Sequence, residues 1–259
     1  MKNNKLLLGQ VLNRREALAL FRAVGTAILV VGWIPKKSNS TQVQSSVGIP
    51  ASLTAASATK HGCVVSPEQT EGPYFVEEKL NRSDIRSDPT DGWVKIGVPL
   101  QLTLRVSLVG SSSCTPIAGA MVDIWHCDAQ GVYSDVTDRS FNTAGQKFLR
   151  GYQMTDANGT VRFTTIYPGR YPGRTTHIHL KVRTNTKSGQ SYEFTSQLYF
   201  DDSISDRVYA QAPYSSKGQR ILKNALDGIF TDGGDQMLLE LDKNGQGYTP
   251  TFDIGLKMA

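Results

Sequence analysis

Residues 100–108 alternate between apolar and polar side chains, and this pattern constrains the fold more than any other feature of the chain. The apolar positions are Leu100, Leu102, Leu104, Val106 and Leu108, and the residues between them are Gln101, Thr103, Arg105 and Ser107. Successive side chains of a β-strand point to opposite faces, so this segment is expected to be a strand with one buried face. Such a strand needs partner strands and a second layer to cover its apolar face.

Further segments of strand-like composition supply those partners. They cover 120–125, 151–155, 160–165, 177–183, 193–200, 237–241 and 252–256. Asn158-Gly159 lies between two of them and is typical of a hairpin turn. Helix-like patterns are limited to 204–210 and a turn or two at 218–224. We therefore predict an all-β fold, a β-sandwich with long loops and few short helices, in one domain over residues 59–259.

The first 58 residues have a different character. Arg14-Arg15 precede an apolar stretch from Ala23 to Ile34 that is short for a membrane span. This arrangement is typical of an export leader, and the paired arginines favour the twin-arginine type. The alternatives are a short amphipathic surface helix or an anchor that is retained. Residues 36–58 are rich in Ser, Thr, Ala and Gln, as in a flexible tether. We expect an exported protein, periplasmic or extracellular, with the cleavage point left open.

The basic isoelectric point, about 9.0, has its origin in this leader. Residues 1–58 hold seven Lys/Arg and one Glu, so of the whole-chain charge of +5 about −1 remains for residues 59–259. A nearly neutral domain gives no reason to expect nucleic acid or an anionic membrane as a partner. After residue 34 no stretch is long and apolar enough to cross a bilayer, so no integral membrane partner is predicted.

The chain has three cysteines, Cys63, Cys114 and Cys127. In an oxidising compartment, one disulfide and one free thiol is the simplest arrangement. Cys114 and Cys127 flank a stretch that looks extended, at ~3.3 Å per residue, and are then too far apart to bridge. Cys63 is therefore expected to pair with either of the other two. There is no Cys-x-x-Cys motif to support a thiolate zinc site.

His177-Ile178-His179 is the first candidate for a functional site. Because positions i and i+2 of a strand share a face, the two imidazoles lie side by side. Neutral imidazole is the commonest metal ligand in proteins. An isolated pair of this kind is more often an ordinary pair of strand histidines, so the interpretation depends on the residues around it.

Two tyrosines in loops near this pair change the interpretation. Tyr133 follows a strand-like segment, and Tyr171 lies in a loop rich in Gly and Pro that leads to His177. A phenolate is a hard anionic donor and suits a ferric ion better than zinc or cuprous copper. A phenol titrates near pH ~10, so only a strong Lewis acid holds it ionised at neutral pH. Two histidines and two tyrosines are thus compatible with a ferric site.

At this point a family resemblance can be stated. The segments Glu71–Phe75, Asp123–Asp135, Gly151–Tyr171 and His177–His179 resemble, in this order, the intradiol ring-cleavage dioxygenases. That family includes the protocatechuate 3,4-dioxygenases and the catechol 1,2-dioxygenases, and the resemblance runs from about residue 63 to residue 200. It implies a β-sandwich catalytic domain with non-haem Fe(III) as cofactor. It also implies that the partners are a small-molecule catechol and O2, which yield a cis,cis-muconate-type diacid.

The resemblance assigns a role to each of the four candidate metal ligands. Tyr133 resembles the equatorial tyrosinate, and Tyr171 the axial tyrosinate that leaves iron when the substrate binds. His177 resembles the axial histidine and His179 the equatorial one. Tyr171 would therefore be both a ligand and a catalytic residue.

The resemblance also assigns residues to the substrate side of the site. Arg174 matches an arginine that stabilises charge developing on the substrate, and Gln197 matches a glutamine near the catechol. Gly72 and Pro73 resemble a pair that lines the substrate pocket. Many relatives have Pro where Arg170 lies, so Arg170 is either an extra pocket cation that suits an acidic substituent or a solvated loop residue.

Further differences and alternatives remain open. Only five residues separate Tyr171 from His177, fewer than in the protocatechuate enzymes, so we expect a more open iron site that admits bulkier catechols. With its expected leader, the chain more closely resembles the exported members of the family. The alternatives are a catalytically silent binding module with the same fold, and a zinc or ferrous hydrolytic site that uses the same histidines. The sequence leaves open which catechol is cleaved and whether the chain forms a homo-oligomer.

Overall fold

Ten strands in two sheets make up most of the regular structure of residues 63–258, the part of the chain that the computed structural model describes. These residues belong to one compact unit, residues 55–259. The predicted leader and tether of residues 1–58 lie outside the described residues. The prediction of an all-β fold is confirmed, with a single α-helix among the described residues.

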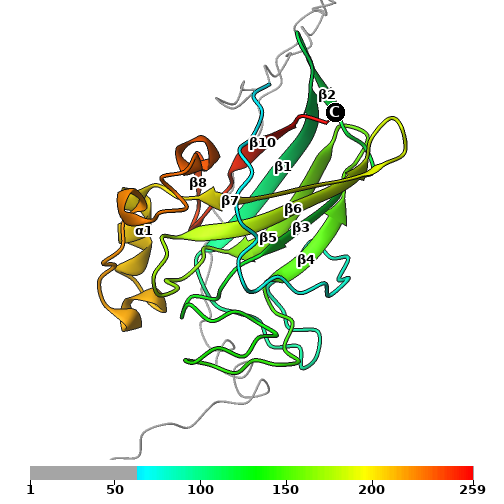
Figure 1. Ribbon diagram of the computed structural model, residues 1–259. Helices are drawn as coiled ribbons and strands as arrows, with labels where there is room; N and C mark the ends of the chain where they lie inside the picture. The colour runs from blue at the N-terminus through cyan, green and yellow to red at the C-terminus, as the bar shows by residue number, and fades with distance from the viewer. Residues whose placement is uncertain (1–62, 259) are drawn as a thin grey trace, which may run out of the picture. The chain divides into compact units, whose positions relative to one another are not determined.

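The first sheet is built around β1, Pro99–Val109. Its strand order is β10-β1-β9-β8, and β2 and β5 also pair with β1. The other bounds are β2 Cys114–Pro116, β5 Thr160–Ile166, β8 Lys243–Asn244, β9 Gly247–Tyr248 and β10 Thr251–Leu256. β1 runs parallel to β10 and antiparallel to β5 (Figure 1).

The second sheet has the strand order β4-β3-β6-β7 and is antiparallel throughout. The strands are β3 Met121–Trp125, β4 Arg150–Met154, β6 His177–Asn185 and β7 Ser191–Tyr199. The helix α1, Asp202–Tyr209, follows β7 and is capped by Asp201, whose carboxylate accepts from the N–H groups of Ser203 and Ile204. Short 3-10 helices follow at Tyr214–Lys217, Asn224–Leu226 and Gly234–Met237.

The alternation along β1 produces the buried face that the sequence predicts. Leu100, Leu102, Leu104 and Val106 are completely buried, and the residues between them are exposed or half-buried. One hydrophobic cluster joins these side chains to Ile178, Leu180 and Val182 of β6 and to residues of β3. Burying an aliphatic side chain of this size contributes ~1.5–3 kcal/mol, so the cluster is a main source of stability.

β6 is buried on both faces, so the polar side chains on its second face are shielded from solvent. Ile178 and Leu180 face the hydrophobic cluster, whereas His177, His179 and Lys181 face the other way and are also buried. Residues 71–80 lie over this second face: the Phe75 ring is 4.9 Å from that of Trp125, and the Lys181 ammonium lies 4.1 Å from the Phe75 ring.

Two sequence predictions about secondary structure are wrong. Residues 237–241 do not form a strand: Met237 ends a 3-10 helix, and Leu238 makes only an isolated bridge to Tyr199. Met237 and Leu239 are buried, so the apolar pattern reflects packing rather than a strand ladder. Of the helical turns expected near 218–224, one lies just before this range, at Tyr214–Lys217, and one begins at its last residue, at Asn224–Leu226.

The second wrong prediction is the hairpin at Asn158-Gly159. The turn itself forms: the Asp156 carboxylate accepts from the N–H groups of Asn158 and Thr160, and Gly159 has a φ of +70°. However, β4 before the turn pairs with β3, whereas β5 after it pairs with β1. The turn therefore carries the chain from one sheet to the other, because local turn chemistry does not determine which partner each strand takes.

The cysteines follow one of the two predicted pairings. Cys63 forms a disulfide with Cys114, and Cys127 is a buried free thiol.

Within residues 63–258 no helix is both long and apolar enough to cross a membrane.

Candidate metal centre

The register of the second sheet places four side chains in one row, and two of them, His179 and Gln197, are predicted site residues. Arg150 of β4 lies opposite Trp125 of β3, Trp125 lies opposite His179 of β6, and His179 lies opposite Gln197 of β7. Directly opposite residues of neighbouring strands have their side chains on the same face. His177 and Tyr199 form a second opposite pair two residues along. The sheet therefore fixes the floor of the site.

His177 is held in a single tautomer. Its Nδ1 lies 2.7 Å from the carbonyl oxygen of Thr175, which can only accept, so in the neutral ring Nδ1 carries the proton. The lone pair of Nε2 is then free, and two other donor atoms surround it. The hydroxyl of Tyr133 is 3.1 Å away and Nε2 of His179 is 3.0 Å away.

His179 is positioned by ring contacts and has one unpartnered nitrogen. Its ring stacks on Trp125, with centroids 4.9 Å apart and planes inclined by 5°. Its Nδ1 is buried and has no hydrogen-bond partner among the described residues. Leaving such a group unpaired costs about 1–3 kcal/mol. A buried imidazole in this state is a suitable ligand for a cation at Nε2.

Electrostatics keep both imidazoles in the form that binds metals. Burial, followed by the charge of Arg174, lowers the pKa of His177 to about 3. Burial, followed by the neighbouring His177 and Arg174, holds the pKa of His179 well below its usual value. Both rings are therefore neutral at pH 7.

The phenol of Tyr133 behaves in the opposite sense. Burial, with a smaller effect of Cys127, raises its pKa well above the usual value, and the charges of Arg174 and Arg150 oppose this. Without a bound metal ion the phenol therefore stays protonated and donates to Nε2 of His177. A bound cation would reverse this preference, because it stabilises the phenolate.

The separations of these donor atoms fit a shared cation. Ligand atoms at ~2.1 Å from a metal, and at right angles to each other, are separated by about 3.0 Å. The distances of 3.0 and 3.1 Å around Nε2 of His177 agree with this. No group of three or more His, Cys, Asp or Glu side chains among residues 63–258 is placed to hold a metal. The candidate centre thus depends on tyrosine oxygens.

Tyr171, the fourth predicted ligand, lies beside this group. Its ring meets that of Tyr133 edge-on, with centroids 5.6 Å apart. Its hydroxyl lies 2.5 Å from that of Tyr74, and the Tyr74 hydroxyl donates to the Asp138 carboxylate at 2.6 Å. Since the single proton of Tyr74 is used for Asp138, Tyr171 donates to Tyr74. The structure therefore brings three of the predicted ligands into contact and holds the fourth next to them.

Tyr74 and Asp138 are further functional candidates, because they form hydrogen bonds beside Tyr171. Tyr74 lies within the Glu71–Phe75 segment that resembles the family, whereas Asp138 is not singled out by the sequence. Burial and the bond to Asp138 raise the pKa of Tyr74, and the same bond lowers the pKa of Asp138. No sequence signal marks Asp138, because its contact with Tyr74 joins residues 64 positions apart.

Arg174 and Gln197 are joined as a pair beside the histidines. Nη2 of Arg174 donates to Oε1 of Gln197 at 2.7 Å, and Nε2 of Gln197 donates to the carbonyl of Thr70 at 2.8 Å. The Tyr199 hydroxyl lies 3.2 Å from Oε1 of Gln197 and 2.9 Å from Oε1 of Gln69. The orientation of the Gln197 amide is thus fixed, and a guanidinium charge lies next to the candidate ligands.

Gly72 and Pro73 differ in their placement. Gly72 has a φ of +74°, and a Cβ atom at this position would lie 3.1 Å from Cε1 of His179. Pro73 is exposed. Gly72 therefore lies directly against a predicted ligand, and Pro73 is at the surface of the covering segment.

Arg170 and His126 have structural partners. The Arg170 guanidinium donates to the carbonyl oxygens of Lys217 and Gln219, which favours the loop role over a pocket cation. His126 is buried, with Nδ1 2.8 Å from the carbonyl of Cys127 and Nε2 2.7 Å from the hydroxyl of Thr165. Both ring nitrogens thus have partners, so His126 is a structural histidine.

Comparisons with known proteins agree with the sequence resemblance. A family model described as "Dioxygenase" matches residues 70–228. The protocatechuate 3,4-dioxygenase beta chain of Burkholderia cepacia is 29% identical over 192 residues, which cover 69% of this chain and 79% of the relative. Catechol 1,2-dioxygenase 1 of Acinetobacter lwoffii is 25% identical over 166 residues, and the match spans 53% of this chain and about half, 49%, of that relative.

Solved structures give the same picture. An intradiol ring-cleavage dioxygenase from Tetranychus urticae is similar with a TM-score of 0.65 and 35% identity, over 75% of this chain and 95% of that one. The dioxygenase domain of a dioxygenase carbohydrate-binding protein fusion from Streptomyces sp. SirexAA-E has a TM-score of 0.54 and 31% identity. That match covers 76% of this chain and 100% of the domain.

Proposed function

Because the chain belongs to the intradiol ring-cleavage dioxygenases, we propose that it opens a catechol-type diol with O2 to a cis,cis-muconate-type diacid. The observation that carries this proposal is that the Tyr133 hydroxyl and Nε2 of His179 both lie within 3.1 Å of Nε2 of His177. Tyr171 and the Arg174–Gln197 pair border the same place. Ligands and a substrate-binding charge are thus combined in one site.

Non-haem Fe(III) is the cofactor that this donor set suits best. Tyr133, Tyr171, His177 and His179 would hold it, since phenolate oxygens favour a hard trivalent ion and the two imidazoles are neutral. When bound, the ferric ion would supply Lewis acidity and a template for the two oxygens of the diol. Zinc bound by the same histidines is the second candidate, but it would not account for the two tyrosines, since phenolate oxygens favour a harder ion.

The protein's own residues prepare the site for an anionic diol. Arg174 supplies a fixed positive charge, and its hydrogen bond to Gln197 fixes the orientation of the guanidinium. Tyr74, Trp125 and Tyr133 are buried in one aromatic cluster, which also holds the half-buried Tyr171. This cluster limits the access of water and strengthens the electrostatic effect of Arg174.

A chain of hydrogen bonds offers a route for protons. It leads from the Tyr171 hydroxyl through Tyr74 to the carboxylate of Asp138, which is half-buried and keeps a lowered pKa. A catechol must lose two protons when it binds as a diolate. The Tyr171–Tyr74–Asp138 chain would pass a proton toward the surface.

The charges around Tyr171 favour a substrate without an acidic substituent. Arg170 is tied to carbonyl oxygens of residues 217–219, so it does not offer its charge to the pocket. Asp138, by contrast, adds a carboxylate close to Tyr171. We therefore expect uncharged catechols to be preferred over carboxylated ones.

The finer features of fold and location are part of the same proposal. The two sheets contribute apolar side chains to one hydrophobic cluster, which supports a β-sandwich. The Cys63–Cys114 disulfide supports an oxidising compartment, in line with an export leader over residues 1–58. We propose that the protein acts in the periplasm or outside the cell.

Oxygen uptake on a panel of catechols, with identification of the product and metal analysis, tests the proposed function. The purified protein should contain iron and be red-brown from tyrosinate-to-iron charge transfer. It should consume one O2 per catechol and form a muconate-type product. A colourless protein that stays inactive after iron loading would indicate a silent binding module. Zinc content without oxygen uptake would indicate a hydrolytic site.

A further inference from the structure

Asp227 lies at the point where the substrate side and the ligand side of the candidate centre meet. Its carboxylate is almost completely buried, with 1% of the side chain exposed. Oδ2 accepts from Nε of Arg174 at 2.8 Å and from the backbone N–H of Thr175 at 2.7 Å. Oδ1 accepts from the backbone N–H of Ile229 at 2.9 Å. Asp227 itself is held rigidly by its own segment.

The bond to Arg174 determines the direction of the guanidinium. Nε is bonded to Asp227, and Nη2 on the other side is bonded to Gln197. Two partners on different nitrogens of a planar group fix both its position and its plane. The side chain still has an exposed fraction of 17%, so the guanidinium remains accessible to a substrate.

The bond to Thr175 acts on the histidine side. The peptide N–H of Thr175 is bonded to Asp227, and its carbonyl accepts the Nδ1 proton of His177. A partner of this kind fixes both the tautomer and the ring orientation of a metal-binding histidine. Asp227 thus reaches His177 through a single residue.

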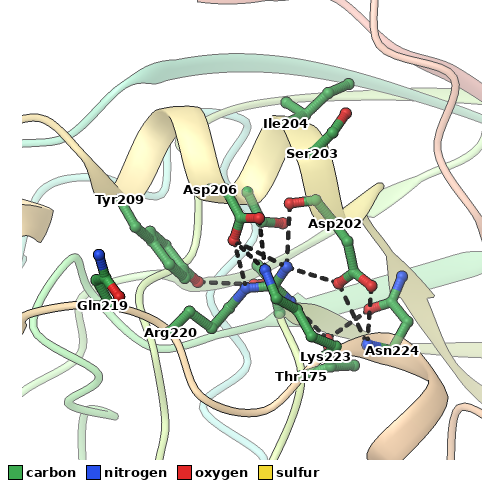
Figure 2. Close-up of polar contacts among 12 residues, drawn as sticks. Thr175, Asp202, Ser203, Ile204, Asp206, Tyr209, Gln219, Arg220, Lys223 and Asn224 are labelled. Carbon is green, nitrogen blue, oxygen red and sulfur yellow. Dashed lines mark hydrogen bonds and ion pairs between the residues drawn. The ribbon is translucent and has the colours of Figure 1, made fainter.

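A second set of contacts keeps Thr175 in place (Figure 2). The Thr175 hydroxyl is 2.5 Å from Oδ1 of Asn224 and 3.3 Å from Nη1 of Arg220. Arg220 is buried and paired with Asp202 and Asp206 of α1. The charge of Arg220 is therefore balanced by these two carboxylates. Arg220 and Asn224 support the loop at Thr175, whereas Asp227 contacts Arg174.

We propose that Asp227 is a positioning residue of the centre, which sets the direction of Arg174 and the peptide that holds His177. Nothing in the sequence near Tyr171 or His177 marks it, because the contact with Arg174 spans 53 positions. The activity part of the inference rests on the proposed function. The two roles are separable, since an asparagine at this position could still accept from Thr175 but would carry no charge for Arg174.

The test compares Asp227→Asn, Asp227→Ala and the control Asp232→Asn, an exposed carboxylate of the same segment. Asp227→Asn should lower kcat for catechol about 10-fold or more with iron affinity retained within about 2-fold. In an Arg174→Gln background the same change should lower kcat by less than about 2-fold, because the effect acts through Arg174. Asp227→Ala should in addition weaken iron binding about 10-fold. Equal losses of kcat in both backgrounds would overturn the inference.

A measurement that needs neither activity nor a variant completes the test. In 15N-arginine-labelled protein, the Nε–H signal of Arg174 should exchange with solvent much more slowly than that of the exposed Arg139. Fast exchange would contradict the pairing with Asp227. If the native protein cleaves no catechol but this signal is protected, the proposed function fails while the pairing stands.

Discussion

Trp125 lies flat against His179, with the ring planes 5° apart and the centroids 4.9 Å apart. The two residues are directly opposite each other on neighbouring strands, so the stacking follows from the strand register. Strand register is rigid, whereas loop conformations vary more readily. The orientation of one predicted ligand is thus set by the sheet itself.

The stacking predicts a specific effect of Trp125→Leu. A leucine keeps the position apolar but removes the flat surface on which the imidazole rests. We expect iron affinity to fall about 10-fold, together with a loss of stability of about 2–4 kcal/mol. Trp125→Phe should retain most of both. Equilibrium dialysis against an iron chelator and urea unfolding measure the two quantities, and unchanged iron affinity in Trp125→Leu would contradict the prediction.

Gly72 predicts a second effect on the same histidine. Gly72→Ala introduces a methyl group 3.1 Å from Cε1 of His179, at a φ of +74°. Gly92→Ala is a matched control, because Gly92 has a φ of +77° and nothing within 4 Å of the added Cβ. Both changes should cost about 1–2 kcal/mol in backbone strain. Only Gly72→Ala should also shift the visible absorption of the iron-loaded protein, and identical spectra for both variants would exclude the contact.

The tyrosines predict the colour of the protein. Tyr133→Phe and Tyr171→Phe each remove a phenolate oxygen, so each should shift or bleach the visible band. Tyr209→Phe is a control, since Tyr209 bonds to Thr176 and Pro168 rather than to a predicted ligand. The visible absorption spectra of the iron-loaded variants are compared with those of the native protein and of Tyr209→Phe. A native spectrum in both ligand variants would show that the assignment of the ligands is wrong.

His126 predicts a pH dependence of stability. Burial lowers its pKa to about 4, below the value of ~6.5 for an unfolded histidine. Below pH ~6.5 the unfolded chain takes up a proton that the folded chain does not, so stability is lost as the pH falls from ~6.5 to about 4. The slope from this residue is about 1.4 kcal/mol per pH unit. Urea unfolding at pH 7, 6 and 5 should therefore give a shallower pH dependence in His126→Gln, and an equal dependence would refute the assignment.

The charges near Tyr171 predict substrate preference. Unsubstituted catechol should have a higher kcat/KM than a ring with a carboxylate, because the Asp138 carboxylate repels a second negative charge. Asp138→Asn should raise the relative kcat/KM of the carboxylated ring several-fold, whereas Arg170→Ala should leave the ratio nearly unchanged. A collapse of turnover of the carboxylated ring in Arg170→Ala would show that Arg170 serves the pocket after all.

The sequence predicts those features that depend on neighbouring residues. The buried face of β1 and the shared face of His177 and His179 follow from the alternation of side chains along a strand. The location of the helix after β7 follows from local pattern in the same way. These features were predictable because a strand or helix imposes its own period.

Features that depend on distant partners could not be predicted in this way. The turn at Gly159 has the right local chemistry, yet its two strands belong to different sheets. Asp138 and Asp227 are ordinary acids in loops until the fold brings them to Tyr74 and Arg174. No local period marks a pairing across more than fifty residues.

The disulfide between Cys63 and Cys114 has a mechanical consequence. It ties the first described residue to the start of β2, and the residues that cover the histidines follow Cys63 along the chain. A pull on the chain ahead of Cys63 would be borne by a covalent bond to the first sheet. The segment that covers His177 and His179 would be spared that load, so a force applied ahead of Cys63 should leave it in place over the predicted ligands.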